Sequence, residues 1–240
     1  IMKNILSAFC SVALLAGISL AGPLDPGAVK TASNVNGVDY EAVLGGFLNG
    51  APGQQHDAAR VDLAAAFDGS ASTFYALGIG GTLVGEAQPG FVFETGVGVI
   101  EVTFGTVNQT YPESALMEFF DTNGTVQASV ELRNLGSSAN SCFGATAGLN
   151  CSTTQNSDST LWSIVLPATF NFSKVVITDT TAVNFAGTYA SNGRLSDGFD
   201  IAELTIRTTA SPVPEPGTIS MIGLGLGMVA LAYRKRGTRR

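Results

Sequence analysis

The sequence is poor in the residues from which catalytic and metal centres are most often built. It contains one histidine, His56, one tryptophan and three cysteines among 240 residues. A Ser/His/Asp arrangement would depend on His56, and no Gly-x-Ser-x-Gly sequence accompanies it. No two carboxylates stand out as a pair for glycoside hydrolysis. We therefore expect a protein that is not an enzyme.

Basic residues are also scarce through most of the chain. Between Gly22 and Pro216 there are six Lys/Arg and all 19 Asp/Glu, which gives 6 − 19 = −13, and the other basic residues lie near the two ends. An acidic surface repels a phosphate backbone, so nucleic acid is excluded as a general partner.

The two ends have the composition of targeting segments. Lys3 precedes an apolar stretch from Ile5 to Ile18, and the small-x-small sequence before Gly22 is typical of a signal-peptide cleavage site. We expect a signal peptide over 2–21, followed by a folded domain over 22–210. Cys10 would leave with the signal peptide.

The C-terminal end combines a stiff linker, a short apolar run and a basic cluster. Prolines make residues 211–217 an extended linker. The run from Ile219 to Tyr233 would be about 23 Å long as a helix, against about 30 Å of hydrocarbon. We expect a transmembrane helix over 218–233 and a cytoplasmic tail over 234–240, held there by Arg234, Lys235 and Arg236.

This order of Val-Pro-Glu-Pro, short apolar helix and terminal basic cluster resembles the PEP-CTERM sorting signal of Gram-negative bacteria that make exopolysaccharide. The resemblance implies that a membrane-embedded exosortase recognises Pro214, Glu215 and Pro216. It also implies an inner-membrane precursor, removal of the tail, and delivery to the cell surface or extracellular matrix.

The domain between the ends has the pattern of an all-β protein. Residues 99–105 and 126–132 alternate apolar and polar side chains, with Val126, Ala128, Val130 and Leu132 on one face. Asn123-Gly124 is a hairpin signal. Further strands are predicted at Thr82–Glu86, Phe91–Thr95, Ala115–Phe120, Leu161–Leu166, Lys174–Asp179 and Asp200–Arg207. Eight short strands without a long amphipathic helix predict a β-sandwich, of jelly-roll type.

Two stretches, residues 64–83 and 197–206, resemble the calcium-binding elements of discoidin-like, galactose-binding-like domains. The resemblance implies a structural Ca²⁺ held by Asp68 with Ser70 or Thr73, and by Glu203 from the last strand. The chain departs from the family pattern by having Phe74 in place of tryptophan. The alternative is an ordinary turn at Asp68 and an exposed Glu203. Asp197 and Asp200 suit either a solvated loop or a cation site.

Cys142 and Cys151 are the cysteines that remain after export. Eight residues lie between them in a Gly/Ala/Ser-rich loop, and an oxidising compartment favours a disulfide between them.

Two functions are compatible with these features. The first is a non-catalytic surface or matrix protein that binds exopolysaccharide or packs into the matrix. The candidate sugar-stacking residues are Tyr75, Tyr111, Trp162 and Tyr189. The apolar neighbours of Trp162 also favour a position in the core for this residue. The second is a secreted glycan-active hydrolase with an unrecognised carboxylate site.

Overall fold

Antiparallel β-strands make up most of the computed structural model, which describes residues 26–49, 60–70, 72–102, 111–135, 141–155, 159–170 and 172–210. These ranges contain one α-helix, α1 (Thr181–Asn192), and a short 3₁₀ helix, η2 (Leu63–Phe67). The strands are β1 (Val29–Val35), β2 (Val38–Val43), β3 (Tyr75–Ala76), β4 (Thr82–Ala87), β5 (Phe91–Val102), β6 (Glu113–Phe120), β7 (Val126–Asn134), β8 (Ser141–Phe143), β9 (Asn150–Gln155), β10 (Ser159–Val165), β11 (Lys174–Asp179) and β12 (Asp200–Ala210).

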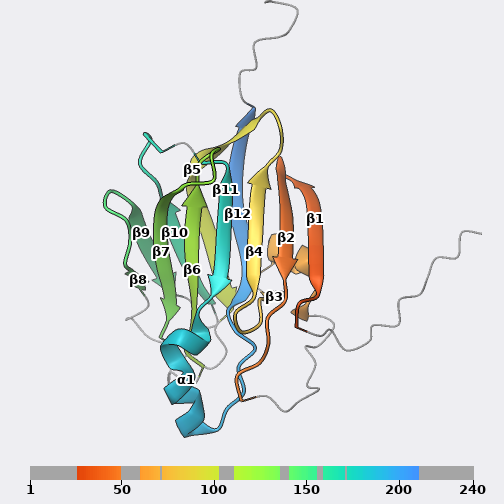
Figure 1. Cartoon of the computed structure of the whole chain (residues 1–240), viewed down its shortest axis with the longest axis vertical. Helices are drawn as coiled ribbons and strands as arrows, with labels where there is room; N and C mark the ends of the chain where they lie inside the picture. The colour runs from red at the N-terminus through yellow and green to blue at the C-terminus, as the bar shows by residue number, and fades with distance from the viewer. Residues whose placement is uncertain are drawn as a thin grey trace, which may run out of the picture.

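The strands form two sheets that pack as a β-sandwich (Figure 1). One sheet has the order β1-β2-β4-β11-β6-β7-β8, and the other has the order β3-β12-β5-β10-β9. Strands that are adjacent in sequence, such as β4 and β5 or β11 and β12, often lie in different sheets. Helix α1 lies at one end of the sandwich, between β11 and β12 in the chain (Figure 1).

The core lies between the inward faces of the sheets. Alternation places Val130 and Leu132 of β7 inside on one sheet and Trp162 and Ile164 of β10 inside on the other, all with no measurable exposure. Trp162 packs against Phe199, with ring centroids 5.7 Å apart. The expected core position of Trp162 is therefore confirmed.

Most of the predicted strands are present, with different lengths. The segment predicted at 91–95 and the part of 99–105 up to Val102 form one strand, β5, which pairs with β12 along most of its length and with β10 from Gly96 to Val102. Residues 103–105 of the predicted segment lie outside the described residues. In β7 the predicted inward face holds from Ala128 onward, but Val126 is 44% exposed because it is the first residue after the turn. The hairpin at Asn123-Gly124 joins β6 to β7, and Gly124 has a φ of 78°.

Several elements were not predicted. Strands β1, β3, β8 and β9 are short or carry mixed polar side chains, so their alternation is weak. Strand β2 alternates regularly over Val38–Val43 and was missed although its pattern is present in the sequence. Helix α1 buries only Thr181 and Tyr189, so it has no apolar stripe for a sequence pattern to reveal. Gly193 ends it in the left-handed conformation, with φ 66°.

The predicted signal peptide (2–21), linker (211–217), transmembrane helix (218–233) and basic tail (234–240) lie outside the described residues. Neither helix in the described ranges has the length and apolar character needed to span a membrane.

Candidate functional site

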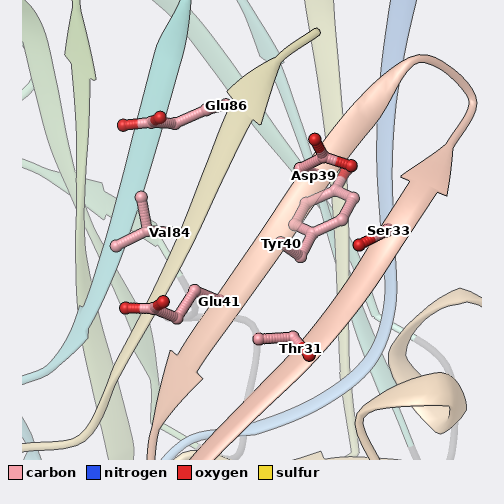
Figure 2. A pocket seen from close by; sticks show the side chains of 7 residues that line it. All are labelled: Thr31, Ser33, Asp39, Tyr40, Glu41, Val84 and Glu86. Atoms are coloured by element: carbon pink, nitrogen blue, oxygen red, sulfur yellow. The ribbon is translucent and has the colours of Figure 1, made fainter.

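A groove lies on the outer face of the seven-stranded sheet, where β1, β2 and β4 run side by side (Figure 2). Its volume is about 330 Å³. Alternation along each strand points the lining side chains away from the core, and five of them are exposed. These five are Thr31, Ser33, Asp39, Glu41 and Glu86.

Carboxylates dominate the groove. In the strand register, Asp39 of β2 lies directly opposite Glu86 of β4, while Glu41 lies opposite Thr31 on one side and Val84 on the other. Lys174 of β11 is opposite Glu86, with Nζ 3.6 Å from Oε1. Three carboxylates and one ammonium group give a local charge of −3 + 1 = −2. The groove is therefore a polar, net acidic surface.

Backbone and side-chain amides orient Asp39. The Asn34 backbone N–H and the Gln88 side-chain amide both donate to Asp39 Oδ1, at 2.8 and 2.9 Å. Asn34 lies near the end of β1, and Gln88 lies in the turn that follows β4. The Asp39 carboxylate is therefore held in place at one end of the groove.

The floor of the groove is made from backbone, because Tyr40 turns its ring inward. Tyr40 is 3% exposed and packs on Phe67, with ring centroids 4.3 Å apart. Burial raises the pKa of Tyr40. A Cβ on Gly85 would lie 2.7 Å from Tyr40 Cε1, so glycine is needed beside the ring. The ring is not available to stack on a ligand in the groove.

The outer face of the five-stranded sheet has a different composition. A depression of about 270 Å³ there is lined by Glu94, Gly96, Val97, Gly98, Ser163, Thr205 and Arg207. It carries one carboxylate and one guanidinium, so it lacks the excess of acidic groups found in the groove.

Three of the predicted calcium ligands form one hydrogen-bonded turn. Asp68 Oδ1 accepts from the Ser70 N–H at 2.8 Å, and Asp68 Oδ2 accepts from the Thr73 hydroxyl at 2.6 Å. The hydrogen bond from Thr73, and then that from Ser70, lower the pKa of Asp68. Gly69 has a φ of 74°, as the turn requires.

Glu203, the fourth predicted ligand, lies on β12 and accepts a hydrogen bond from the Thr205 hydroxyl at 3.0 Å. The described residues include no group of three or more His, Cys, Asp or Glu side chains arranged to hold a metal ion. The predicted set has only two carboxylates, so a calcium site of Asp68, Ser70, Thr73 and Glu203 stays a prediction.

Cys142 and Cys151 form a disulfide, with Cα atoms 6.1 Å apart. Cys142 belongs to β8, the edge strand of the seven-stranded sheet, and Cys151 belongs to β9, the edge strand of the five-stranded sheet. The disulfide therefore joins the two sheets along one open side of the sandwich, rather than only pinning a loop.

Asp197 and Asp200, expected in a solvated loop or a cation site, are buried against Arg60. Arg60 Nη1 lies 2.6 Å from Asp197 Oδ2, and Nη2 lies 3.0 Å from Asp200 Oδ2. Asp200 is 1% exposed, and its Oδ1 has no hydrogen-bond partner among the described residues. Burial, followed by the charge of Asp197, raises the pKa of Asp200, and Arg60 opposes this shift. The solvated-loop expectation was wrong because Arg60, distant in sequence, covers both carboxylates.

A third buried acid, Asp179 at the end of β11, fixes the neighbouring backbone. It accepts hydrogen bonds from the Gly80 and Phe199 N–H groups and from the Thr181 hydroxyl, at 3.0, 2.8 and 2.7 Å. Burial raises its pKa, although these hydrogen bonds oppose the rise. Asp179 thereby connects β11, the loop before β4 and the loop before β12.

Three of the four candidate sugar-stacking aromatics are wrong for that role. Tyr75, Trp162 and Tyr189 have no measurable exposure. The Tyr189 hydroxyl donates to the Pro112 carbonyl at 3.1 Å, so this residue anchors α1 to the sandwich. Tyr111 is partly exposed, and its ring lies 4.9 Å from the Arg194 guanidinium.

Comparison with known proteins gives one match, at the C-terminal end. Residues 212–236 match the family model of the PEP-CTERM protein-sorting motif. The chain carries a PEP-CTERM sorting signal. Exosortase is accordingly the processing partner that the motif implies, acting on an exported, membrane-anchored precursor destined for the cell surface. No curated protein matches the chain, and no solved structure matches it. The sorting motif thus concerns the localisation of the protein, and its molecular function has to be sought in the β-sandwich.

Proposed function

We propose that this protein is a non-catalytic component of the cell surface or extracellular matrix that binds exopolysaccharide in the groove over β1, β2 and β4. The observation that carries the proposal is the groove itself. It lies on an exposed sheet face, and its carboxylates and hydroxyls can accept hydrogen bonds from sugar hydroxyls. The sorting motif supports delivery to the cell surface, where we expect the protein to meet such a polymer.

Charge restricts the class of polymer. The groove is net acidic, and the chain from Gly22 to Pro216 carries −13. A polymer rich in uronate or sulfate would be repelled at close range. The proposed ligand is therefore a neutral polysaccharide, or one that bears amino groups.

We favour binding over hydrolysis because the two carboxyl groups with raised pKa values, Asp179 and Asp200, lie away from the groove. A glycosidase needs a proton-donating carboxyl group beside the substrate. Asp179 and Asp200 have raised pKa values, but they are 4% and 1% exposed and do not line the groove.

A structural Ca²⁺ is part of the proposal for the fold. The turn at Asp68 brings its carboxylate together with the Thr73 hydroxyl, and hard oxygen ligands of this kind suit Ca²⁺. The proposed jelly-roll, galactose-binding-like fold rests on the same residues as the calcium site. A stability that depends on calcium would support both proposals.

The test uses mature protein purified from producing cells and the polymer of the same cells. We expect the protein to sediment with the polymer, and Glu41→Gln to reduce this binding. Glu118→Gln, on the outer face of β6 beyond the groove, is the matched control and should bind as the parent does. The polymer's size distribution is measured after incubation. Shortening would favour the hydrolase, and equal binding by both variants would remove the groove from the proposal.

A further inference from the structure

The last strand of the sandwich ends beside two turns at the end opposite α1 (Figure 1). One turn, residues 36–37, joins β1 to β2, and the other, residues 88–90, joins β4 to β5. The final residues of β12 pair with the start of β5, so that Thr209 faces Val92 and Ala210 faces Phe91. We call this end, formed by the two turns and residues 208–210, the β12 rim.

The β12 rim is a tightly connected unit. The Thr208 hydroxyl donates to the Asn36 carbonyl, and the Gln88 N–H donates to the Gly37 carbonyl at 2.9 Å. A Cβ on Gly37 would lie 2.6 Å from Thr208 Oγ1 and 2.8 Å from the Phe91 ring, which shows how closely the turn approaches the strand. The point at which the chain leaves the sandwich is therefore fixed to both turns.

The sorting motif begins almost immediately after this point. Its match starts at residue 212, and Glu215 is five residues beyond Ala210. Even a fully extended chain spans no more than about 3.6 Å per residue, so five residues keep Glu215 within about 18 Å of Ala210. An eleven-residue strand such as β12 is about 36 Å long, which puts α1 well beyond that reach.

We propose that the β12 rim is the face of the folded protein that exosortase contacts while it processes the motif. The short tether keeps an enzyme acting at Pro214–Pro216 closer to the rim than to any part of the sandwich near α1. Residues 36–37 and 88–90 include no charged side chain, and the Asp39 carboxylate beside them accepts hydrogen bonds from Asn34 and Gln88. The proposal rests on the sorting motif and is independent of glycan binding in the groove.

The test is site-specific photo-crosslinking of the full-length precursor in producing cells. A photoreactive residue replaces Asn36 or Gln88 on the rim, Val183 on α1, or Val213 inside the motif as the positive control. Val183 is the matched control because it is 84% exposed at the other end of the sandwich. We expect crosslinks to exosortase from both rim positions and none from Val183. Crosslinks as strong from Val183, or crosslinks from Val213 without any from the rim, would overturn the proposal.

A second variant tests the tether as the cause. A flexible Gly/Ser segment of about 20 residues inserted after Ser211 adds a mean span of about 25 Å. We expect the rim crosslinks to be lost while the Val213 crosslink persists. If the rim crosslinks persist at full strength, the tether explanation is wrong. Neither outcome depends on whether the groove binds a polysaccharide, so the two proposals fail separately.

Discussion

Asp39 and Glu86 face each other directly on neighbouring strands of the seven-stranded sheet, both exposed in the same groove. A pair of like charges in this position destabilises a sheet. Lys174 lies beside Glu86 rather than between the two acids, and the two donors to Asp39 are neutral amides. The surface proposed to bind polysaccharide therefore contains a pair of like charges that lowers the stability of the fold.

This relationship predicts opposite effects of one substitution on stability and on binding. Asp39→Asn keeps an acceptor for Asn34 and Gln88 but removes the repulsion with Glu86. We expect a gain of about 0.5 kcal/mol in the free energy of unfolding, measured by urea denaturation at low salt, together with weaker polymer binding. Glu41→Gln, which has no acidic neighbour directly opposite, should weaken binding without the gain. A loss of stability in Asp39→Asn would contradict this account.

The disulfide predicts a sandwich that opens at one side when it is removed. Replacing both Cys142 and Cys151 with alanine should lower the free energy of unfolding by about 2–3 kcal/mol, from chain entropy for a loop of this length. Amide hydrogen exchange should rise first in β8 and β9, the edge strands that the bond joins. Two free thiols in unreduced, mature protein would show that the bond does not form after export.

The buried acids predict a stability that falls as pH rises above about 4. The folded protein keeps Asp200 protonated to a higher pH than the unfolded chain does, because its pKa is raised in the fold. Between the unfolded value, about 3.9, and the folded one, the folded state binds more protons, so the free energy of unfolding decreases with pH. Asp200→Asn should flatten this slope, as measured by denaturation across pH 4 to about 8.

Arg60→Met is the complementary variant. It leaves Asp197 and Asp200 buried without their counter-charge, and we expect a loss of about 3 kcal/mol at neutral pH. If Asp200→Asn destabilises the protein as much as Arg60→Met does, the cluster works as a favourable ion pair and the assigned direction of the Asp200 pKa is wrong.

Calcium should stabilise the protein if Asp68 and Glu203 share a cation. Because a ligand that binds only the folded state adds to its stability, we expect a higher melting temperature in calcium than in chelator. Asp68→Ala and Glu203→Gln should each abolish the difference. If the parent melts at one temperature under both conditions, the turn at Asp68 is held by Ser70 and Thr73 alone.

The sorting motif predicts a processed C-terminus. Mass spectrometry of mature surface protein should detect no peptide beyond Gly217, because the motif directs removal of the tail. Glu215→Ala should leave the precursor in the inner membrane, detected by cell fractionation. Intact protein that contains Tyr233 at the cell surface would contradict the expected processing.

The sequence by itself determined the features that depend on local patterns. Strict alternation predicted β7 and most of the other long strands, because period-two burial needs no knowledge of the partner strand. Asn123-Gly124 predicted its hairpin, because few dipeptides favour that turn. The sorting signal was also identifiable, because a sorting motif is defined by the order of its residues rather than by a fold.

Tertiary structure decided the features that depend on residues distant in the chain. Arg60 pairs with Asp197 and Asp200 and covers both carboxylates. The disulfide, predicted to pin a loop, joins the two sheets because its cysteines lie on the edge strands β8 and β9. The groove arises because β2 pairs with β4 in a register that places Asp39 opposite Glu86. Alternation in β2 and β4 puts Asp39 and Glu86 on the outer face, but a shift of two residues in the pairing would keep that face and give Asp39 a different partner. The long-range pairing of strands therefore built the candidate site from residues that, separately, are only exposed acids.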